Sequence, residues 1–280
     1  MIATVSAPAT TANLGPGYDI LGLALGLRCV VSADLADEWS VEHTGEHAPE
    51  DGEPDAVLAA AQHTVGDRPL AMSVANEIPL GRGLGSSSAA LVAGAAAALL
   101  ATEGALSPDR VFRVATQLEG HPEQVAACVY GGLVLVPATG LPMRLPLHPS
   151  LRPVVGIPQG RLSTTEARAV VDDHQDLDVV IRSLARVATL TAGLITGDAG
   201  MLDAARGDEI HEAPRAEIDP DPEELIRVAR QAGALHASRS GAGPAVVALT
   251  TVETADRVAA AFVEMGVGVL NKPVESSGLI

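Results

Sequence analysis

Residues 78–100, with the sequence IPLGRGLGSSSAALVAGAAAALL, constrain the fold of this chain more than any other stretch. Gly81, Gly83 and Gly85 occupy alternate positions, three serines follow, and a run rich in alanine and leucine comes next. Alanine and leucine favour helix and serine favours helix starts, so the pattern predicts a glycine loop that runs into a helix N-terminus. The unpaired backbone N–H groups of such a turn bind anions, most often phosphate. The alternative interpretation is a flexible loop before a buried helix.

Length and composition set the broad class of the protein. The 280 residues are enough for one large or two ordinary domains. With 47% apolar but only 2% aromatic residues, the core must consist mainly of alanine, valine, leucine and isoleucine. Cys29 and Cys128 form neither a disulfide framework nor a CxxC motif, and the first residues do not resemble a signal peptide, so we expect a cytoplasmic protein. We also expect no membrane span, since the nearest candidate, residues 84–102, is mostly alanine and serine.

The charge pattern excludes several functions. A net charge of -17 argues against nucleic acid and anionic membranes as partners, and the scarcity of aromatic residues removes the usual stacking platform for single strands. The only lysine is Lys272, so the glycine loop lacks the lysine of a GxxxxGK[ST] P-loop. The single lysine, close to the C-terminus, also argues against Schiff-base chemistry. The acidity is consistent with a need for solubility or with a saline habitat.

The remaining patterns indicate the order of the elements. We expect strands over residues 21–27 and 29–35, then a surface hairpin or loop over residues 37–55. Within that loop, His43-Thr-Gly-Glu46-His47 matches the HxxEH zinc motif, but a glycine inside it and a proline just after it oppose the helix that the motif needs, so we reject a zinc site. Proline and glycine cluster over residues 140–149. The final stretch alternates as helix, strand, strand, helix and strand, which is typical of an open α/β sandwich.

Three segments together resemble one family. Residues 8–25 (PATTANLGPGYDILGLAL), 79–90 (PLGRGLGSSSAA) and 240–244 (SGAGP) are similar, in order and spacing, to the three motifs of the GHMP small-molecule kinases. Residues 119–135 and 163–171 resemble the homoserine kinase branch of that family. The resemblance implies an α+β fold with an N-terminal ribosomal-S5-like domain and a C-terminal ferredoxin-like domain. We place the phosphate-loop domain at residues 1–148 and the C-terminal GHMP domain at residues 149–280.

The resemblance also implies the reaction and the ligands. Members of that branch transfer the γ-phosphate of ATP to the side-chain hydroxyl of L-homoserine, a step of threonine biosynthesis, and are often homodimers. Mg²⁺ is expected near Ser87 and Glu119, which offer the hard oxygen ligands that it prefers; the alternative for Glu119 is a solvated carboxylate at a helix end. The residues expected to bind ATP are Pro79, Leu80, Gly81, Arg82, Gly83, Leu84, Gly85, Ser86, Ser87, Ser88 and Ala89.

The substrate site follows from the same resemblance. Asn13 and Asp19 match family residues near the substrate, and Arg168 and Arg215 match the arginines that bind its carboxylate. A planar guanidinium suits this role because it pairs bidentately with a carboxylate. An exposed salt bridge is the alternative for Arg168, and Arg215 falls in what we expect to be an acidic loop. His121 is expected either to touch the substrate or to be structural.

One departure from the family stands at Glu123-Gln124, where the family usually has Asp-Asn. Each side chain keeps its functional group but is longer by one methylene, so the group moves by roughly 1.5 Å unless the backbone compensates. We expect Glu123, Gln124 and Arg168 to form the catalytic set, and whether Glu123 acts as a general base is left open. Two alternatives follow from the departure: a GHMP kinase for another small hydroxylated substrate, and a non-catalytic nucleotide or metabolite sensor on the same fold.

Overall fold

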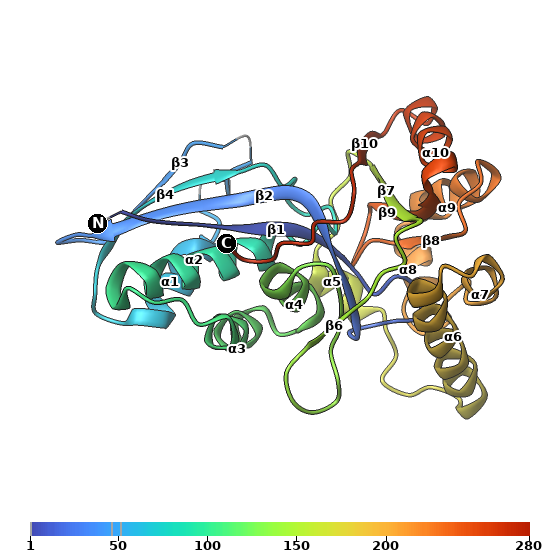
Figure 1. Cartoon of the computed structure of the whole chain (residues 1–280), viewed down its shortest axis with the longest axis horizontal. Helices are drawn as coiled ribbons and strands as arrows, with labels where there is room; N and C mark the ends of the chain where they lie inside the picture. The colour runs from blue at the N-terminus through green and yellow to red at the C-terminus, as the bar shows by residue number, and fades with distance from the viewer. Residues whose placement is uncertain (1, 46, 51) are drawn as a thin grey trace.

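The computed structural model describes residues 2–45, 47–50 and 52–280. It contains two β-sheets, each with helices packed against it, which lie side by side along the long axis of the molecule (Figure 1). This mixture of helices and largely antiparallel sheets is the α+β class expected from the sequence.

The first sheet occupies the N-terminal half of the chain. Its order is β3-β4-β2-β5-β6, and β1 also pairs with β2. Its strands are β1 (Ala3–Ala12), β2 (Leu21–Leu35), β3 (Ser40–His43), β4 (Leu70–Asn76), β5 (Leu133–Leu135) and β6 (Met143–Leu145). Buried and non-buried residues alternate along β4, so this strand turns one face to the core. The helices α1 (Ala56–Val65), α2 (Ser86–Glu103), α3 (Pro108–Glu119) and α4 (Glu123–Tyr130) lie below the sheet in Figure 1.

Two expectations about this half were wrong. The strands expected over residues 21–27 and 29–35 form the single strand β2. Its pairing with β1 shifts register between the Pro8–Arg28 and Ala9–Leu25 pairs, so that Gly26 and Leu27 lie opposite no residue of β1. The surface hairpin or loop expected over residues 37–55 contains the strand β3, which forms no hairpin because it pairs in parallel with β4. Both differences arise from pairing with strands distant in sequence, which local composition does not encode.

The alanine-rich helix α2 forms the centre of this half. It packs against β1, β2 and three neighbouring helices, and twelve of its residues are buried. Small side chains permit this close approach: a Cβ at Gly94 would lie 2.4 Å from the carbonyl oxygen of Val57 on α1. The helix is therefore apolar on all sides, as expected for a core helix.

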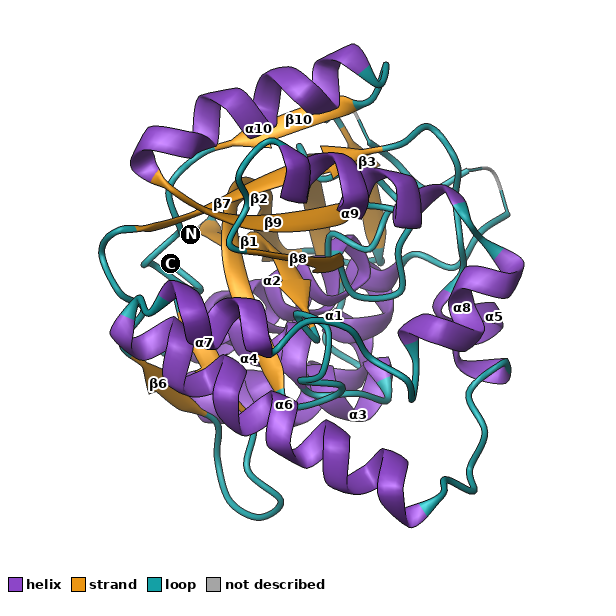
Figure 2. Ribbon diagram, turned by 90° about the vertical axis from the view of Figure 1, so that its right-hand side faces the viewer, coloured by secondary structure: helices purple, strands orange, loops and turns teal. Residues whose placement is uncertain are grey.

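The second sheet, in the order β10-β7-β9-β8, is antiparallel throughout. Its strands are β7 (Leu151–Ile157), β8 (His236–Arg239), β9 (Val246–Thr251) and β10 (Gly268–Asn271). The accompanying helices are α5 (Thr164–Ala169), α6 (Leu177–Thr196), α7 (Ala199–Ala204), α8 (Glu212–Ile218), α9 (Asp221–Gln231) and α10 (Val252–Glu264). Figure 2 shows α9 and α10 over this sheet, where Val154, Ile226 and Phe262 share a separate core. The division at residues 148 and 149 stays a prediction, because the last residues return to the first sheet: Ser6 and Ile280 exchange backbone hydrogen bonds of 2.6 and 3.0 Å.

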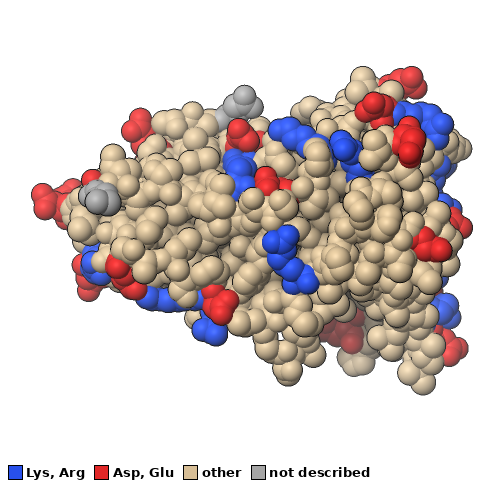
Figure 3. Space-filling model, in the orientation of Figure 1, with Lys and Arg blue, Asp and Glu red and all other residues tan. Residues whose placement is uncertain are grey.

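The expected absence of a membrane span stays a prediction, since length and mean hydropathy alone would allow two helices to cross a membrane. These helices are α2 and α6, with mean hydropathies of 1.3 and 1.5. The apolar window of α2 is 67% buried and fills the core, whereas that of α6 is only 17% buried and exposes Leu177, Ile181 and Leu184. On the face drawn in Figure 3, basic side chains lie in small groups among acidic ones and form no continuous stripe.

The glycine loop, residues 81–85, follows β4 of the first sheet and contacts the segment that follows β8 of the second sheet. Ser240, which follows β8, donates its hydroxyl to the carbonyl oxygen of Gly83 at 2.8 Å, and its Oγ also lies 2.9 Å from Thr11 Oγ1. The amide of Ala245 donates to the carbonyl of Arg82 at 3.2 Å. Gly83 has a φ of +74° and leaves no room for a side chain, since a Cβ there would lie 2.0 Å from the Ser240 carbonyl oxygen.

A matched pair of glycine substitutions tests this contact. Gly81 has a similar φ of +65°, but a Cβ there meets only the flexible Arg161 side chain at 3.4 Å. We predict that Gly81→Ala lowers the free energy of unfolding by about 1 kcal/mol through backbone strain alone. Gly83→Ala should lower it by several times that amount, because the two sheets must also separate. Urea unfolding measures both variants, and equal losses would contradict the close contact.

Candidate active site

The glycine loop leads into the N-terminus of α2, as the sequence predicted. Gly85 is the N-cap residue in the left-handed conformation and provides no side-chain cap. The first N–H groups of α2 therefore have no partner within the helix and are available to an anion. A small cavity of about 120 Å³ opens there, lined by loop residues together with Glu119, Gln124 and Thr164.

The three serines of the loop have different roles. Ser86 is buried; its hydroxyl donates to the Ile78 carbonyl at 3.2 Å and accepts from the Asn76 side chain at 3.2 Å, so this side chain secures the end of β4. Ser87 and Ser88 both donate to Glu119, at 2.8 and 2.7 Å. Among the predicted ATP-binding residues, Leu84, Ser88 and Ala89 are also buried, so their side chains belong to the core or to the Glu119 contact.

Glu119 and Ser87 fit the expected magnesium site. They place a carboxylate and a hydroxyl 2.8 Å apart at the mouth of the phosphate loop. Mg²⁺ is commonly held by one or two such oxygens, with substrate phosphates and water completing its shell. The described residues contain no group of three or more His, Cys, Asp or Glu side chains that could hold a metal by themselves. The donor set therefore suits a cation that arrives with a phosphate ligand.

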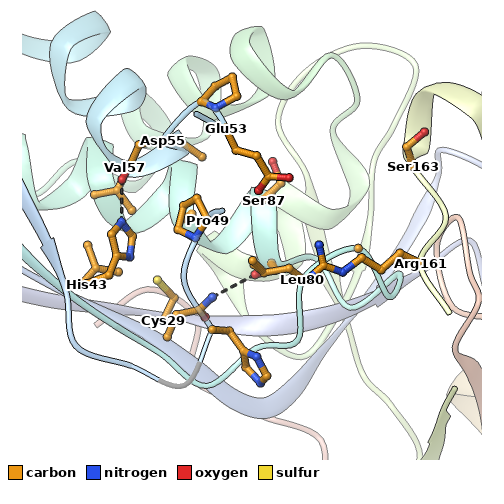
Figure 4. A pocket seen from close by; sticks show the side chains of 18 of the residues that line it. Cys29, His43, Pro49, Glu53, Asp55, Val57, Leu80, Ser87, Arg161 and Ser163 are labelled. Atoms are coloured by element: carbon orange, nitrogen blue, oxygen red, sulfur yellow. Dashed lines mark hydrogen bonds and ion pairs between the residues drawn. The ribbon is translucent and has the colours of Figure 1, made fainter. Parts of the chain in front are cut away.

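A larger cavity of about 330 Å³ adjoins the loop and was not predicted from the sequence (Figure 4). Its walls are largely apolar, and they include Cys29, Pro49, Val57, Val74 and Leu80. His43 on β3 and the α1 N-cap residue Asp55 pair at one end of it, with 2.6 Å between Nε2 and Oδ2. His43 and His47 of the rejected zinc motif both line this cavity, whereas Glu46 lies outside the described residues. Segments distant in sequence form the cavity together, so no local sequence pattern predicted it.

The segment that follows β7 closes this side of the site. Leu162 donates its amide to the carbonyl of Gly81 at 3.2 Å. Arg82 donates to the carbonyl of Pro158, so its side chain secures the loop. Arg161 lines the large cavity and pairs with Glu50 at 2.9 Å.

On the other side of the loop the structure brings together the predicted substrate residues. Arg168 on α5 forms a bidentate pair with Asp19, with N–O distances of 2.6 and 3.1 Å. The Asn13 amide oxygen accepts from the Asp19 backbone N–H at 3.1 Å, and its nitrogen donates to the Gly241 carbonyl at 3.2 Å. The pair joins the first motif to the C-terminal half of the chain.

Arg215 lies deeper, and its surroundings differ from the expected acidic loop. It belongs to the helix α8, and its side chain is buried. Its Nε donates to the carbonyl of Ala167 at 2.9 Å, and its guanidinium carbon lies 5.3 Å from the centre of the Tyr18 ring. Arg168 approaches the same ring at 5.4 Å. Both arginines therefore converge on one tyrosine, a cation–π arrangement that the sequence did not reveal.

His121 lies between two carboxylates at the edge of the site. Its Nδ1 is 3.3 Å from Glu123 Oε1, and its Nε2 is 3.8 Å from Glu119 Oε1. Burial lowers the pKa of His121, but its attraction to Glu123 and Glu119 outweighs burial, so the pKa is raised. Glu123 is 2% exposed, and its Oε2 has no hydrogen-bond partner among the described residues. A buried carboxylate oxygen without a partner is unfavourable unless a ligand satisfies it.

Gln124 points elsewhere. Its Oε1 accepts from Thr10 Oγ1 at 3.2 Å. Two glycines make room for its longer side chain: a Cβ at Gly85 would lie 2.5 Å from its Oε1, and a Cβ at Gly241 would lie 2.5 Å from its Nε2. The extra methylene relative to asparagine is thus accommodated between the phosphate loop and the glycine turn after β8.

Four of the predicted residues, Ser87, Glu119, His121 and Arg168, line a common cavity. A third cavity, of about 300 Å³, is lined by Ser87, Glu119, Gly120, His121, Thr164, Thr165 and Arg168. It connects the candidate magnesium ligands with the arginine that pairs with Asp19. The arrangement can hold a polyphosphate and a small zwitterion on either side of the Ser87 hydroxyl.

Two family models match the chain, that of the GHMP kinases N terminal domain over residues 55–132 and that of the GHMP kinases C terminal over residues 190–268. The homoserine kinase of Moorella thermoacetica is 37% identical in an alignment 286 residues long that spans 94% of this chain and 93% of that protein. The homoserine kinase of Thermus thermophilus is 41% identical over 250 residues, with coverages of 86% and 85%.

Solved structures are similar over the whole chain. The crystal structure of homoserine kinase from Cytophaga hutchinsonii has a TM-score of 0.86 and 28% identity, covering 100% of this chain and 96% of that one. A mevalonate kinase with 12% identity and a TM-score of 0.73 shares the fold alone.

The helix that carries Arg215 has a pH-dependent stability that can be tested. Glu212 on α8 is buried, accepts from the Arg239 amide at 2.7 Å, and burial raises its pKa to about 7. Between pH 4.5 and 7 the folded protein therefore keeps a proton that the unfolded chain has released, so the free energy of unfolding falls as pH rises. Glu212→Gln cannot ionise but can still accept from Arg239, so it should flatten this fall in urea unfolding at pH 5 and 7.5. The exposed Glu217→Gln is the control, and an unchanged slope in Glu212→Gln would refute the assignment.

Proposed function

The chain belongs to the homoserine kinases of the GHMP kinase family, and we propose that it transfers the γ-phosphate of ATP to the side-chain hydroxyl of L-homoserine. The observation that carries this proposal is the position of Ser87. Ser87 lies at the start of α2, and its hydroxyl contacts Glu119 at the end of α3. Ser87 also lines the same cavity as Arg168 and His121. ATP, the phosphate donor, and L-homoserine, whose hydroxyl accepts the phosphate, would thus bind in adjoining sites.

The large cavity and the glycine loop suit ATP. An apolar cavity of about 330 Å³ is large enough for a nucleoside, and it borders Gly81, Ser86 and Ser87. The triphosphate extends along the loop, where the free N–H groups of α2 and its dipole stabilise negative charge. Ser87 and Glu119 would hold Mg²⁺, which supplies charge neutralisation to the phosphate oxygens.

The polar residues around Arg168 suit the amino-acid part of L-homoserine. In the proposed complex the substrate ammonium contacts Asp19 and the carboxylate contacts both Arg168 and Arg215, with Asn13 and His121 nearby. Asp19 and Arg168 already neutralise each other at 2.6 Å. The substrate ammonium can take the place of the Arg168 guanidinium beside Asp19, and the substrate carboxylate can take the place of Asp19 beside Arg168. Binding therefore leaves neither side chain without an opposite charge.

The transfer step then needs mainly alignment and one proton acceptor. The substrate hydroxyl oxygen forms a bond to the γ-phosphorus while the bond from that phosphorus to the β,γ-bridging oxygen breaks and ADP leaves. We assign the hydroxyl proton to Glu123, whose buried Oε2 has no other partner among the described residues. Gln124 supports the phosphate loop through Thr10 and does not contact the substrate in this scheme.

The product, O-phospho-L-homoserine, places the enzyme in threonine biosynthesis. A cytoplasmic location stays a prediction. A homodimer stays a prediction, as does the absence of nucleic acid and membrane partners. Sedimentation of the purified protein measures the oligomeric state directly.

A coupled assay of ADP release tests the function. The panel is L-homoserine, D-homoserine, L-serine, L-threonine and mevalonate, with ATP and Mg²⁺. We expect turnover with L-homoserine alone, and we expect Ser87→Ala to abolish most of it while the melting temperature changes little. Turnover with a different panel member would identify another GHMP kinase activity. Clear ATP binding without any turnover would identify the non-catalytic sensor.

Two arginines on opposite sides of the loop test the assignment of the two subsites. We predict that Arg168→Ala raises KM for L-homoserine roughly 10- to 100-fold, the effect of losing a charged hydrogen-bond pair, and leaves KM for ATP unchanged. Arg161→Ala should do the reverse, because Arg161 lines the nucleoside cavity. Steady-state kinetics with either substrate varied measures both. A parallel rise in both KM values for Arg168→Ala would contradict its role.

A further inference from the structure

His211 is a buried imidazole that the proposed reaction does not use. It is the N-cap residue of α8, and none of its surface is exposed. Its Nε2 lies 2.8 Å from the carbonyl oxygen of Gly15, and its Nδ1 lies 2.9 Å from Nη1 of Arg215. A single ring therefore joins the first sequence motif to the buried arginine of the substrate site.

The chemistry of these two partners fixes the state of the ring. A guanidinium can only donate, so Nδ1 must accept and carries no proton. A carbonyl can only accept, so Nε2 must carry the proton and donate it to Gly15. The ring is thus neutral, and burial lowers its pKa to about 4, which keeps it neutral at physiological pH.

His211 also orients an aromatic neighbour. Its ring stacks on Tyr18, with the ring centres 4.5 Å apart and the planes 21° from parallel. Tyr18 is the residue on which Arg168 and Arg215 converge, and it precedes Asp19. The segment that carries them contains three non-glycine residues with positive φ: Asn13 at 69°, Leu14 at 52° and Asp19 at 58°. Such conformations persist only where surrounding contacts hold them.

We propose that His211 is a positioning residue for L-homoserine: by accepting from Arg215, donating to Gly15 and stacking on Tyr18, it fixes Arg215, one of the two carboxylate-binding arginines, relative to the ammonium-binding Asp19. This inference rests on the proposed function. The carboxylate and ammonium subsites come from segments almost 200 residues apart in sequence, and His211 contacts both. Its effect is therefore on substrate affinity and not on nucleotide binding.

Isosteric substitutions separate the contacts of His211. Asparagine can place an acceptor near the position of Nδ1 and so retain Arg215, while glutamine can place a donor near Nε2 and retain only Gly15. We expect His211→Gln to raise KM for L-homoserine tenfold or more, and His211→Asn to raise it less than threefold. KM for ATP should stay within twofold in both. His211→Phe keeps the stacked ring without either hydrogen bond and should resemble His211→Gln.

A substrate analogue without the carboxylate distinguishes positioning from a general structural role. We would use 3-aminopropan-1-ol, as an alternative substrate or as a competitive inhibitor of the wild-type enzyme and the variants. Because it cannot use Arg215, its KM or Ki should change less than twofold in His211→Gln. His236→Asn is the matched control, since His236 is also buried and binds the neighbouring Leu14 carbonyl at 2.9 Å without contacting Arg215. It should lower the melting temperature and leave KM for L-homoserine unchanged.

Each outcome bears on the inference. Equal effects of the Asn and Gln variants, an equal loss of affinity for the analogue, or no change in KM for L-homoserine would each overturn it. A wild-type enzyme that does not phosphorylate L-homoserine would instead refute the proposed function, and the wild-type assay separates the two failures.

Discussion

The N-terminus of α2 is the constraint on which the rest of the structure depends. Its unpaired N–H groups can bind an anion only if no side chain caps them, if protein shields them from water on one side and if the helix axis is held in a fixed direction. Burial of the alanine-rich helix fixes its direction, and the Gly83–Ser240 contact fixes the loop before it. A helix of larger residues could not approach α1 as closely as Gly94 does. The small residues of the core and the geometry of the loop thus both hold the N-terminus of α2 in place.

The two halves of the chain share the site because of this constraint. The N-terminal half of the chain supplies the glycine loop, Glu119 and Asp19, whereas the second half supplies Arg168, Arg215 and the glycine turn after β8. The C-terminal segment returns to β1, so the second half is tied back to the first at Ser6 as well. Neither half has a complete site alone, which is consistent with phosphoryl transfer as a problem of positioning.

The sequence predicted the features that short motifs encode. The glycine loop before α2 and the final order of helix, strand, strand, helix and strand depend on neighbouring residues, and both agree with the structure. The sequence did not predict the cavity at His43 and Asp55, the helix around Arg215 or the direction of Gln124. Each of these depends on a contact between distant segments, such as β3 with β4 or Gln124 with Thr10. No local pattern encodes such contacts, and for this reason the role of His211 also became visible only in the fold.

A structure with L-homoserine and a non-hydrolysable ATP analogue would test the central claim most directly, namely that the loop and the polar cluster serve one transfer reaction. The account predicts the nucleoside in the cavity beside His43 and the triphosphate along the glycine loop. It also predicts the homoserine hydroxyl facing the γ-phosphate from the Ser87 side, with the carboxylate at Arg168. A homoserine molecule bound away from Arg168, or a hydroxyl that points away from the γ-phosphate, would contradict it.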